Sequence, residues 1–337
     1  SERELMEQIR VRLDFLWFLG FDLDSEIPDH SVLSKARARW GAEVFEKLFL
    51  QTGRQGVEAG LVNGRLLHVD STMGKANAHR DSVVASGAEL VGALRKAYQQ
   101  QEAKLAVLPA PAQPAAAEGS PVLAAAPQTS PKLLVNSTHI STSDPEAELA
   151  RSKNGVTELN YKEHRLVDDA QGVITAVAAT GANVADGTQL PGLYGQHRQS
   201  TGLALGQVTV AGDHHYGTAD NYLFCAQAGL RAHLGPARAH VEERGKLPPS
   251  QFVYEPAHGR LRCPQGQYLE CHQERPEQQT KVYLSANPQA CARCVLREQC
   301  TQSKRGRSIR RHVQADVVEA LRRAASSPAA RYSRKRR

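Results

Sequence analysis

The chain has 337 residues, of which 41% are hydrophobic and 23% charged, so it can bury the core of one main domain with accessory parts. It contains no apolar run of membrane-spanning length, no signal-peptide pattern, no nucleophile elbow and no phosphate-binding loop. The net charge of +7 is concentrated at one end, because residues 303–337 carry 12 Lys/Arg against 2 Asp/Glu. Such a segment indicates either contact with a polyanion or a solvated, disordered tail, and charge alone does not separate the two.

Residues 1–60 are predicted to form an N-terminal helical region. Leucine and isoleucine recur at helical spacing from Leu5 to Leu16, which predicts a buried stripe on a helix that ends at Gly20. Asp29 is suited to cap a second helix that ends at Gly41, and a third is expected over residues 42–50. That third helix is expected to bury Val44, Phe45, Leu48 and Phe49. The second helix suits either DNA contact or an ordinary amphipathic surface.

A carboxylate closes a short apolar run in the next segment, residues 61–95. After the turn signal Asn63-Gly64, residues 66–69 predict a strand buried on both faces, with Asp70 at its carboxyl end. Ligands of open α/β sheets bind at this edge. An isolated aspartate there more often caps a turn. A helix is expected to follow over residues 88–105.

Residues 96–135 are rich in Ala, Pro, Gln and Ser, and they are interpreted as a linker that is disordered for lack of apolar area. Residues 159–167 and 173–180 predict a β-hairpin, and residues 186–195 predict a helix. Residues 206–213 repeat the earlier pattern of an apolar strand that ends in an aspartate, Asp213. Thr218 is suited to cap a helix through residue 226, and a strand is expected over residues 230–234.

Two strands that each end in an aspartate can bring two carboxylates together. If their strands are neighbours, Asp70 and Asp213 can chelate a divalent metal ion. His214 and His215 follow directly, and we expect them to be structural or peripheral.

The cysteines form a second cluster in residues 251–312. Cys291 and Cys294 make a C-x-x-C knuckle, Cys300 follows, and Cys263 and Cys271 lie upstream, whereas Cys225 is expected in a helix core. Four thiolates suit tetrahedral zinc, and disulfides are the alternative. A basic run follows the cluster and suits phosphate contact; it comprises Lys304, Arg305, Arg307, Arg310 and Arg311.

Taken in order, several of these segments resemble a known family. They are residues 28–35 (PDHSVLSK), 68–72 (HVDST), 143–147 (SDPEA), 161–164 (YKEH), 212–213 with Tyr216, Gly217 and Asn221, 263–266 (CPQG) and the later cysteines. The chain resembles the bacterial insertion-sequence transposases of the DDE type, in the branch with a cysteine-bearing insertion.

The resemblance implies an α/β fold: a ribonuclease-H-like mixed sheet flanked by helices, an N-terminal helical region and a small zinc-ribbon-like insertion. The catalytic core would continue over residues 136–250, the insertion would occupy 251–312, and a helix with a basic C-terminal segment would occupy 313–337. Asp70 and Asp213 would be the first two acids of the catalytic triad, which holds Mg²⁺ or Mn²⁺.

The resemblance also implies zinc ligands and partners. The ligands would be Cys263, Cys291, Cys294 and Cys300, with Cys271 or His272 as substitutes. The partner would be double-stranded DNA at element ends and target sites, with no membrane contact. A homodimer is compatible with this reading, and the location would be the bacterial cytoplasm, at the nucleoid.

The sequence departs from the family at the third acid. A glutamate is expected after an Arg/Lys-rich lead such as residues 332–337, where the chain stops, and Asp316 and Glu319 are interpreted as surface acids. The start at Ser1 without methionine predicts a missing segment there too, so we expect a chain truncated at both ends with little or no DNA cleavage. The alternative is a non-catalytic, zinc-containing DNA-binding remnant of a transposase.

Overall fold

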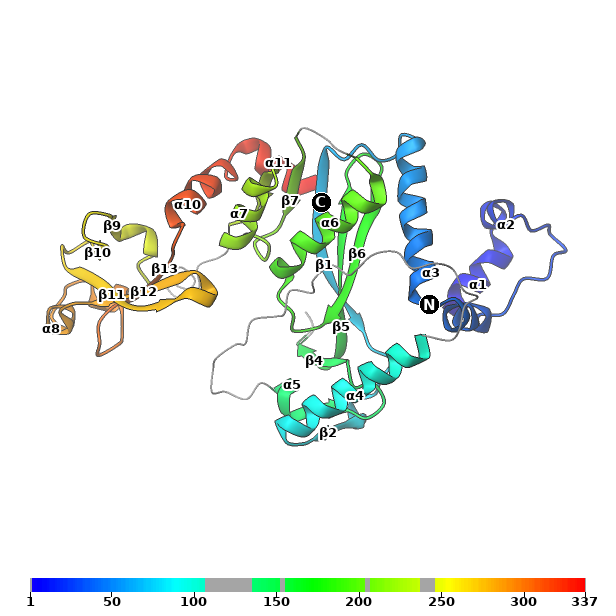
Figure 1. Ribbon diagram of the computed structural model, residues 1–337, viewed down its shortest axis with the longest axis horizontal. Coiled ribbons are helices and arrows are strands. Elements are labelled where there is room, and N and C mark those ends of the chain that lie inside the picture. The colour runs from blue at the N-terminus through cyan, green and yellow to red at the C-terminus, as the bar shows by residue number, and fades with distance from the viewer. Residues whose placement is uncertain (1, 107–134, 152–154, 204–206, 237–245, 337) are drawn as a thin grey trace.

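A computed structural model describes residues 2–106, 135–151, 155–203, 207–236 and 246–336. A central mixed sheet with its helices lies in the middle of the molecule, N-terminal helices lie on one side of it, and a second sheet lies on the other (Figure 1). The linker expected at residues 96–135 lies mostly outside the described residues, although its first part belongs to a helix that ends at Ala106.

The N-terminal region is helical, as predicted. Helices α1 (Glu2–Val11) and α2 (Leu13–Leu19) are separated at Arg12, and Gly20 ends α2 with a left-handed φ of 71°. Helix α3 (Ser31–Glu58) has non-helical backbone at Gly41, which confirms the predicted break. It then continues past residue 50, the end that the sequence predicted.

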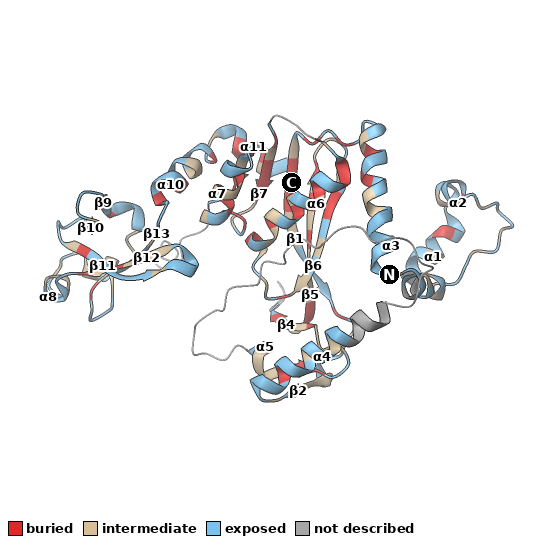
Figure 2. Cartoon of the chain, viewed as in Figure 1, coloured by how far each residue is buried: buried red, intermediate tan, exposed pale blue. Residues whose placement is uncertain are grey.

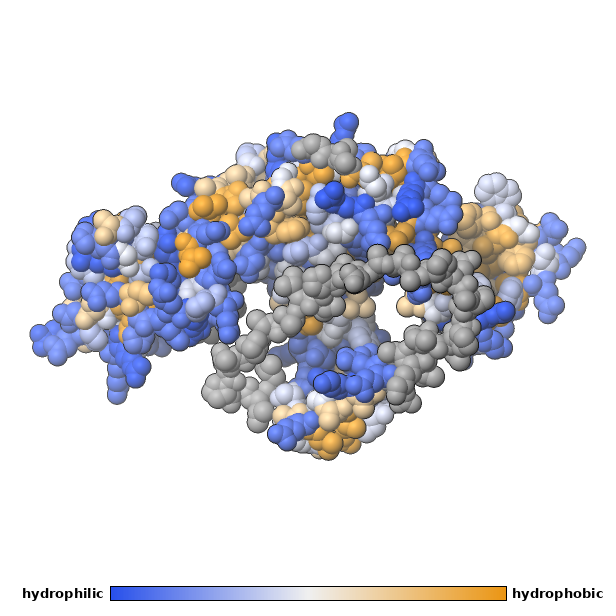
Figure 3. Space-filling model, in the orientation of Figure 1, coloured by the Kyte–Doolittle hydropathy of each residue, from blue (hydrophilic) through white to orange (hydrophobic). Residues whose placement is uncertain are grey.

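The buried faces predicted for these helices are largely wrong. Ile9 and Leu16 of the predicted stripe are buried, but Leu5 is 42% and Leu13 70% exposed. Val44, Phe45 and Leu48 are exposed as well, and Phe49 is intermediate. The reason is that α1 and α2 pack on each other at the edge of the molecule, so their apolar side chains reach the surface (Figures 2 and 3).

The central sheet has the strand order β4-β5-β1-β7-β8, and β6 also pairs with β5. The strands are β1 (Leu66–Lys75), β4 (Glu148–Arg151), β5 (Thr157–Asp168), β6 (Val173–Gly181), β7 (Thr209–Gly212) and β8 (Arg231–Leu234). Strand β5 runs antiparallel to β1, β4 and β6, whereas β7 runs parallel to β1 and β8. The sheet is therefore mixed, and the predicted hairpin β5-β6 and strand β8 are confirmed.

Helices cover this sheet and complete its core. They are α6 (Leu190–Thr201), α7 (Ala219–Gln227), α10 (Ala315–Ala324) and α11 (Pro328–Arg336). Leu67 and Val69 of β1 are fully buried in the main hydrophobic cluster, with Leu193 of α6, Tyr222 of α7 and Val318 of α10. Thr218 caps α7 by accepting a hydrogen bond from the Asn221 N–H at 3.3 Å, as expected. Helix α6 begins after the short 3₁₀ turn η2 (Asp186–Gln189), so it starts later than predicted.

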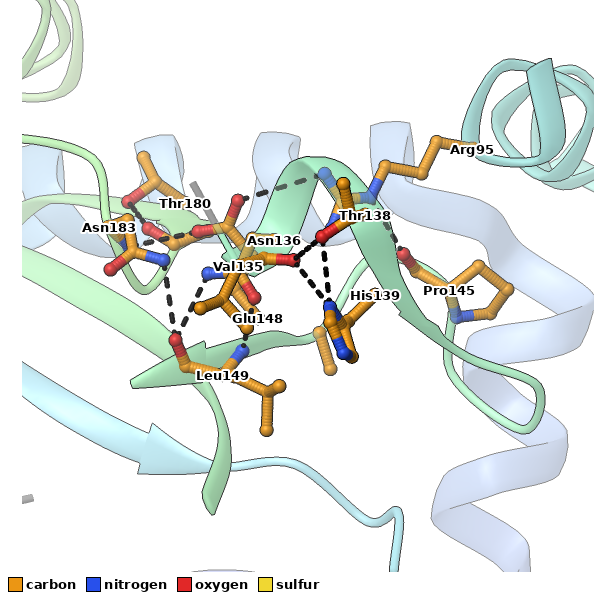
Figure 4. Close-up of polar contacts among 12 residues, drawn as sticks. Arg95, Val135, Asn136, Thr138, His139, Pro145, Glu148, Leu149, Thr180 and Asn183 are labelled. Carbon is orange, nitrogen blue, oxygen red and sulfur yellow. Dashed lines mark hydrogen bonds and ion pairs between the residues drawn. The ribbon is translucent and has the colours of Figure 1, made fainter. Parts of the chain in front are cut away.

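A smaller helical subdomain attaches to the edge strand β4. It contains η1 (Arg80–Ser82), β2 (Val83–Ala85), α4 (Ala88–Ala106), α5 (Val135–Thr138) and β3 (His139–Ser141). Asn136 exchanges two hydrogen bonds with the Leu149 backbone at 2.9 and 3.0 Å, and Glu148 accepts one from the Asn183 N–H at 2.9 Å (Figure 4). The amide of Asn136 thus satisfies backbone groups that an edge strand would otherwise leave unpaired.

The second sheet is antiparallel, in the order β13-β12-β11-β10-β9. Its strands are β9 (Val253–Glu255), β10 (Arg260–Arg262), β11 (Tyr268–Arg275), β12 (Thr280–Ser285) and β13 (Ser308–His312); around them lie η4 (Pro249–Gln251), η5 (Pro276–Gln278), α8 (Pro288–Ala292) and α9 (Arg297–Cys300). It has its own small core around Phe252, Leu261 and Tyr283. The chain then returns to the central sheet through α10 and α11 (Figure 1).

Within the described residues, no helix is both long and apolar enough to cross a membrane.

Gly212 ends β7 directly before Asp213. A Cβ atom at this position would lie 2.7 Å from Val69 Cγ1, so we expect Gly212→Ala to lower the free energy of unfolding by about 1–3 kcal/mol through overpacking. The measurement is urea denaturation. Gly74→Ala on β1 is the control, because its Cβ would meet nothing within 4 Å. Equal effects of the two substitutions would refute this account.

Candidate metal and nucleic-acid sites

The first site lies where β7 ends beside β1. The parallel register pairs Leu67 with Val210 and His68 with Ala211. Strand β7 ends at Gly212, and continuation of the same register by two residues would put Asp70 beside Asp213. In-register neighbours on adjacent strands are about 4.8 Å apart. Sequence reasoning misplaced Asp70 in one respect: it lies within β1, not at its end, because antiparallel pairing with β5 continues as far as Lys75.

Main-chain hydrogen bonds hold both carboxylates. Asp70 Oδ1 accepts from the Ser71 N–H at 2.9 Å, and Asp213 Oδ1 accepts from the His215 N–H at 2.8 Å. Both aspartates are half-buried. Such bonds restrict the orientation of each carboxylate, which suits a side chain that would bind a cation.

A buried tyrosine hydroxyl lies among three carboxylates. Tyr216 is fully buried, and its hydroxyl makes no hydrogen bond of ordinary geometry within the described part of the chain. Burial raises the pKa of this hydroxyl, and the nearby carboxylates of Asp186, Asp70 and Asp213 raise it further, whereas the Ser71 hydroxyl opposes the rise. The structure therefore brings Asp186 to the same place as the two predicted aspartates.

Sequence reasoning missed Asp186, which begins η2. Its carboxylate is 11% exposed and lies 2.8 Å from Lys162 Nζ, which also donates to the Val184 carbonyl at 2.8 Å. Burial by itself raises the pKa of Asp186, but Lys162, with smaller contributions from Ser71 and His215, outweighs burial and lowers the pKa overall. The sequence offered one indirect signal for Asp186: its partner Lys162 belongs to the motif at residues 161–164. The motif did not indicate which acid pairs with that lysine.

The loop after β7 is fixed from two sides by close backbone packing. A Cβ at Gly187 would lie 2.9 Å from the His215 carbonyl oxygen, and a Cβ at Gly235 would lie 2.8 Å from the His214 nitrogen. Asp213, His214 and His215 each offer a potential metal-ligand atom, and these atoms lie within 4.8 Å of one another. Among the described residues, no other group of three His, Cys, Asp or Glu side chains lies so close together.

The second site is a small cavity beside the second sheet. Cys263, Cys291, Cys294 and Cys300 all line this cavity of about 30 Å³, which is close to the volume of one water molecule. Cys271 lies on β11 and is exposed, as is His272. The structure thus gathers the four cysteines that the family resemblance named and leaves both substitutes outside, and all six cysteines are free thiols. Cys225 is fully buried in the main core, as expected.

Hydrogen-bond donors surround these sulfur atoms. The Gln267 N–H donates to Cys263 Sγ at 3.3 Å and the Leu296 N–H to Cys294 Sγ at 3.4 Å, while Ser285 Oγ lies 3.1 Å from Cys291 Sγ. Burial raises the pKa of the Cys300 thiol, nearby Arg307 opposes the rise, and the other three sulfur atoms add to it. The mutual influence of the four sulfur atoms agrees with their shared cavity.

The five basic residues predicted to contact DNA differ in their surroundings. Lys304, Arg305 and Arg310 are exposed. Arg307 instead donates to the carbonyl oxygens of Cys300 and Leu247 at 3.0 and 2.9 Å. Arg311 is 13% exposed, pairs with Asp316 at 2.6 Å and stacks on Tyr254. Arg307 and Arg311 therefore stabilise the second sheet, and the three exposed residues are available to a phosphate backbone.

Comparison with known proteins gives one match. Residues 1–39 match the family model of a transposase domain (DUF772). This match supports a transposase family for the chain. No curated protein and no solved structure matches it.

The Lys162–Asp186 pair generates a stability prediction. Asp186→Asn leaves the ammonium of Lys162, which is 15% exposed, without its counter-charge, so we expect a loss of roughly 1–3 kcal/mol in the free energy of unfolding at pH 7. Folding lowers the pKa of Asp186. The contribution of the Lys162–Asp186 pair to the free energy of unfolding is therefore fully present above about pH 4, and it disappears as the pH falls through the folded-state pKa of Asp186.

The matched control is Glu158→Gln, which breaks the pair between Lys75 and Glu158, whose side chains are 68% and 35% exposed. We expect that substitution to cost less than about 1 kcal/mol. Both variants are compared by urea denaturation at pH 7 and pH 3. An Asp186→Asn effect as small as that of the control would contradict a buried, energetically important pair.

Proposed function

We propose that this chain is a DNA transposase of the DDE type, a class whose ribonuclease-H-like core hydrolyses and transfers phosphodiester strands at insertion-sequence ends, and that this chain by itself cleaves DNA little or not at all. One observation carries the proposal: β1, which contains Asp70, pairs in parallel with β7, which ends directly before Asp213, and both aspartates interact with the buried Tyr216. The mixed sheet with helices packed on it agrees with the fold that the family resemblance implies. The transposase-domain match at residues 1–39 is independent support, because it lies outside the proposed catalytic residues.

The surroundings of Asp70 and Asp213 fit a divalent cation. Two half-buried carboxylates that both interact with the same buried tyrosine offer oxygen ligands to a cation. Asp70 and Asp213 would hold Mg²⁺ or Mn²⁺ through oxygen. When bound, such ions activate the attacking water or 3′ hydroxyl and stabilise charge on the leaving oxygen.

The position of α11 also supports this reading. Arg336 pairs with Asp169 at 2.8 Å, and the other oxygen of Asp169 lies 2.8 Å from His68 Nε2. His68 and Asp70 share one face of β1, because side chains alternate along a strand. Helix α11 is therefore tied to the face that carries Asp70, which is where the family resemblance expects a helix that leads to the third acid.

Four cysteines that line one cavity suit a structural zinc ion, although among the described residues no three of their sulfur atoms lie within 4.8 Å of one another, so binding would draw them together. The cysteines come from three separate turns around one small cavity. Backbone N–H groups donate hydrogen bonds to two of the sulfur atoms, those of Cys263 and Cys294. Such donors stabilise thiolates, which are the form that binds zinc. A module this small has a limited hydrophobic core, and a bound ion would supply the missing stability.

DNA is the proposed partner, and the second sheet supplies one contact surface. Lys304 and Arg305 lie in the turn before β13, and Arg310 lies within that strand. All three side chains are exposed. Contacts of this kind position a duplex without reading its sequence, so binding should weaken steeply with salt.

Magnesium should strengthen DNA binding through the two aspartates. At constant ionic strength, we expect Mg²⁺ to raise the DNA affinity of the native protein about tenfold, because the ions relieve repulsion between the carboxylates and phosphate. The double variant Asp70→Asn/Asp213→Asn should bind DNA more tightly than the native protein in EDTA and should lose the magnesium effect. Fluorescence anisotropy with a labelled duplex measures both.

Asp81→Asn is the control, since Asp81 is an exposed acid in the attached subdomain, 89% exposed. It should leave the magnesium effect intact. DNA binding that is insensitive to magnesium in every variant would refute the catalytic-site proposal and favour the non-catalytic DNA-binding alternative.

Zinc should be required for the second sheet to keep its structure. Protein purified under reducing conditions should contain one zinc ion per chain, and Cys291→Ser/Cys294→Ser should lose it together with protection of residues 253–312 from proteolysis. Cys271→Ser, which changes an exposed cysteine outside the cavity, should retain both. Native protein without zinc by metal analysis would overturn the assignment.

A further inference from the structure

Two histidines lie against the proposed catalytic centre without a role in it. The imidazole rings of His214 and His215 have centroids 4.1 Å apart. One ligand atom from each ring and one from Asp213 lie within 4.8 Å of one another. These atoms need to move only slightly to share one cation, since metal–nitrogen and metal–oxygen bonds are about 2 Å long.

The surroundings of this group are those of a metal ligand set. Asp186 lies near His215, and a carboxylate near an imidazole can help to orient a ligating histidine. The fully buried Tyr216 hydroxyl lies close to Asp186, Asp70 and Asp213 and interacts with the Ser71 hydroxyl. Carboxylates and an imidazole that gather at one place in this way suit a bound cation.

The backbone of the loop is already fixed in place. Gly187 and Gly235 let neighbouring segments approach His215 and His214 to within van der Waals contact. The Gly217 N–H donates to the His214 carbonyl at 3.3 Å, and Asn221 Nδ2 donates to the Tyr216 carbonyl at 2.9 Å. A loop held in this way loses little entropy when it binds an ion.

We propose that Asp213, His214 and His215 form a mixed oxygen–nitrogen site that makes the centre bind first-row transition metals more tightly than Mg²⁺. Magnesium prefers oxygen ligands alone. Imidazole suits the later first-row metals best, and affinity rises from Mn²⁺, the weakest binder of the series, so tight Mn²⁺ binding is a stringent test of nitrogen ligation. The inference rests on the proposed function for its location, because Asp213 belongs to both. The two imidazoles add the selectivity.

Mn²⁺ itself is the probe, and the intact protein is used with its cysteine cluster loaded with zinc beforehand. Free Mn²⁺ is followed by electron paramagnetic resonance during titration, and Mg²⁺ affinity is measured by competition. We expect the native chain to bind Mn²⁺ at least tenfold more tightly than Mg²⁺. The variant His214→Ala/His215→Ala should bind Mn²⁺ about tenfold more weakly and Mg²⁺ as before.

His258→Ala is the matched control, because His258 is a 62% exposed histidine on the second sheet, and it should change neither affinity. Spin-echo modulation from a directly bound nitrogen should be present in the native complex and absent from the double variant. Far-UV circular dichroism establishes that the variants fold.

The outcomes separate the two proposals. Unchanged Mn²⁺ affinity in the histidine variant, or an absent nitrogen signal, would overturn the mixed site while leaving the aspartate pair intact. Loss of Mn²⁺ binding in the histidine variant, with no effect of metal on DNA binding, would support the mixed site and count against the catalytic proposal.

Discussion

The parallel pairing of β1 with β7 is the constraint on which the rest of the structure depends. It brings the segments that carry two aspartates far apart in the chain, Asp70 and Asp213, to one edge of the sheet, and it buries Leu67, Val69 and Val210 beside them. Apolar burial fixes the register, because a shift by one residue would turn these side chains out of the core. The same burial that stabilises the sheet therefore determines where the carboxylates meet.

Such a concentration of acids needs compensation, and the structure shows several forms of it. Main-chain N–H groups bind Asp70 and Asp213, and Lys162 neutralises Asp186. Asp169 is paired with both His68 and Arg336. Asp186 and Asp169 thus pair with protein cations, and the proposal assigns a metal ion to Asp70 and Asp213.

The second sheet follows a different physical rule. Its hydrophobic core is small, and arginines hold parts of it together: Arg307 through two carbonyl groups and Arg311 through Asp316 and Tyr254. The four cysteines close the turns at its cavity. In this module Arg307 and Arg311 bind other protein groups, whereas Lys304, Arg305 and Arg310 are exposed to solvent.

The sequence by itself determined the local elements. Apolar periodicity and turn residues were sufficient for the β5-β6 hairpin, strand β8, the capped helix α7 and the breaks at Gly20 and Gly41, because each depends on neighbouring residues. The C-x-x-C spacing likewise singled out the cysteine cluster. The exposed faces of α1 and α3 were mispredicted, since periodicity shows which side chains could be buried and not what covers them.

Only the tertiary structure decided which distant groups meet. Asp186 and Lys162 are separated by a strand and a turn, and nothing local joins them to Asp70, Tyr216 or His215. The same holds for Arg307 and Arg311, which read as solvent-exposed cations in a basic run until the second sheet supplies carbonyl oxygens, a carboxylate and an aromatic ring for them. Long-range pairing of strands brings such groups together, and that pairing is set by the burial of the whole sheet, which no single segment of sequence encodes.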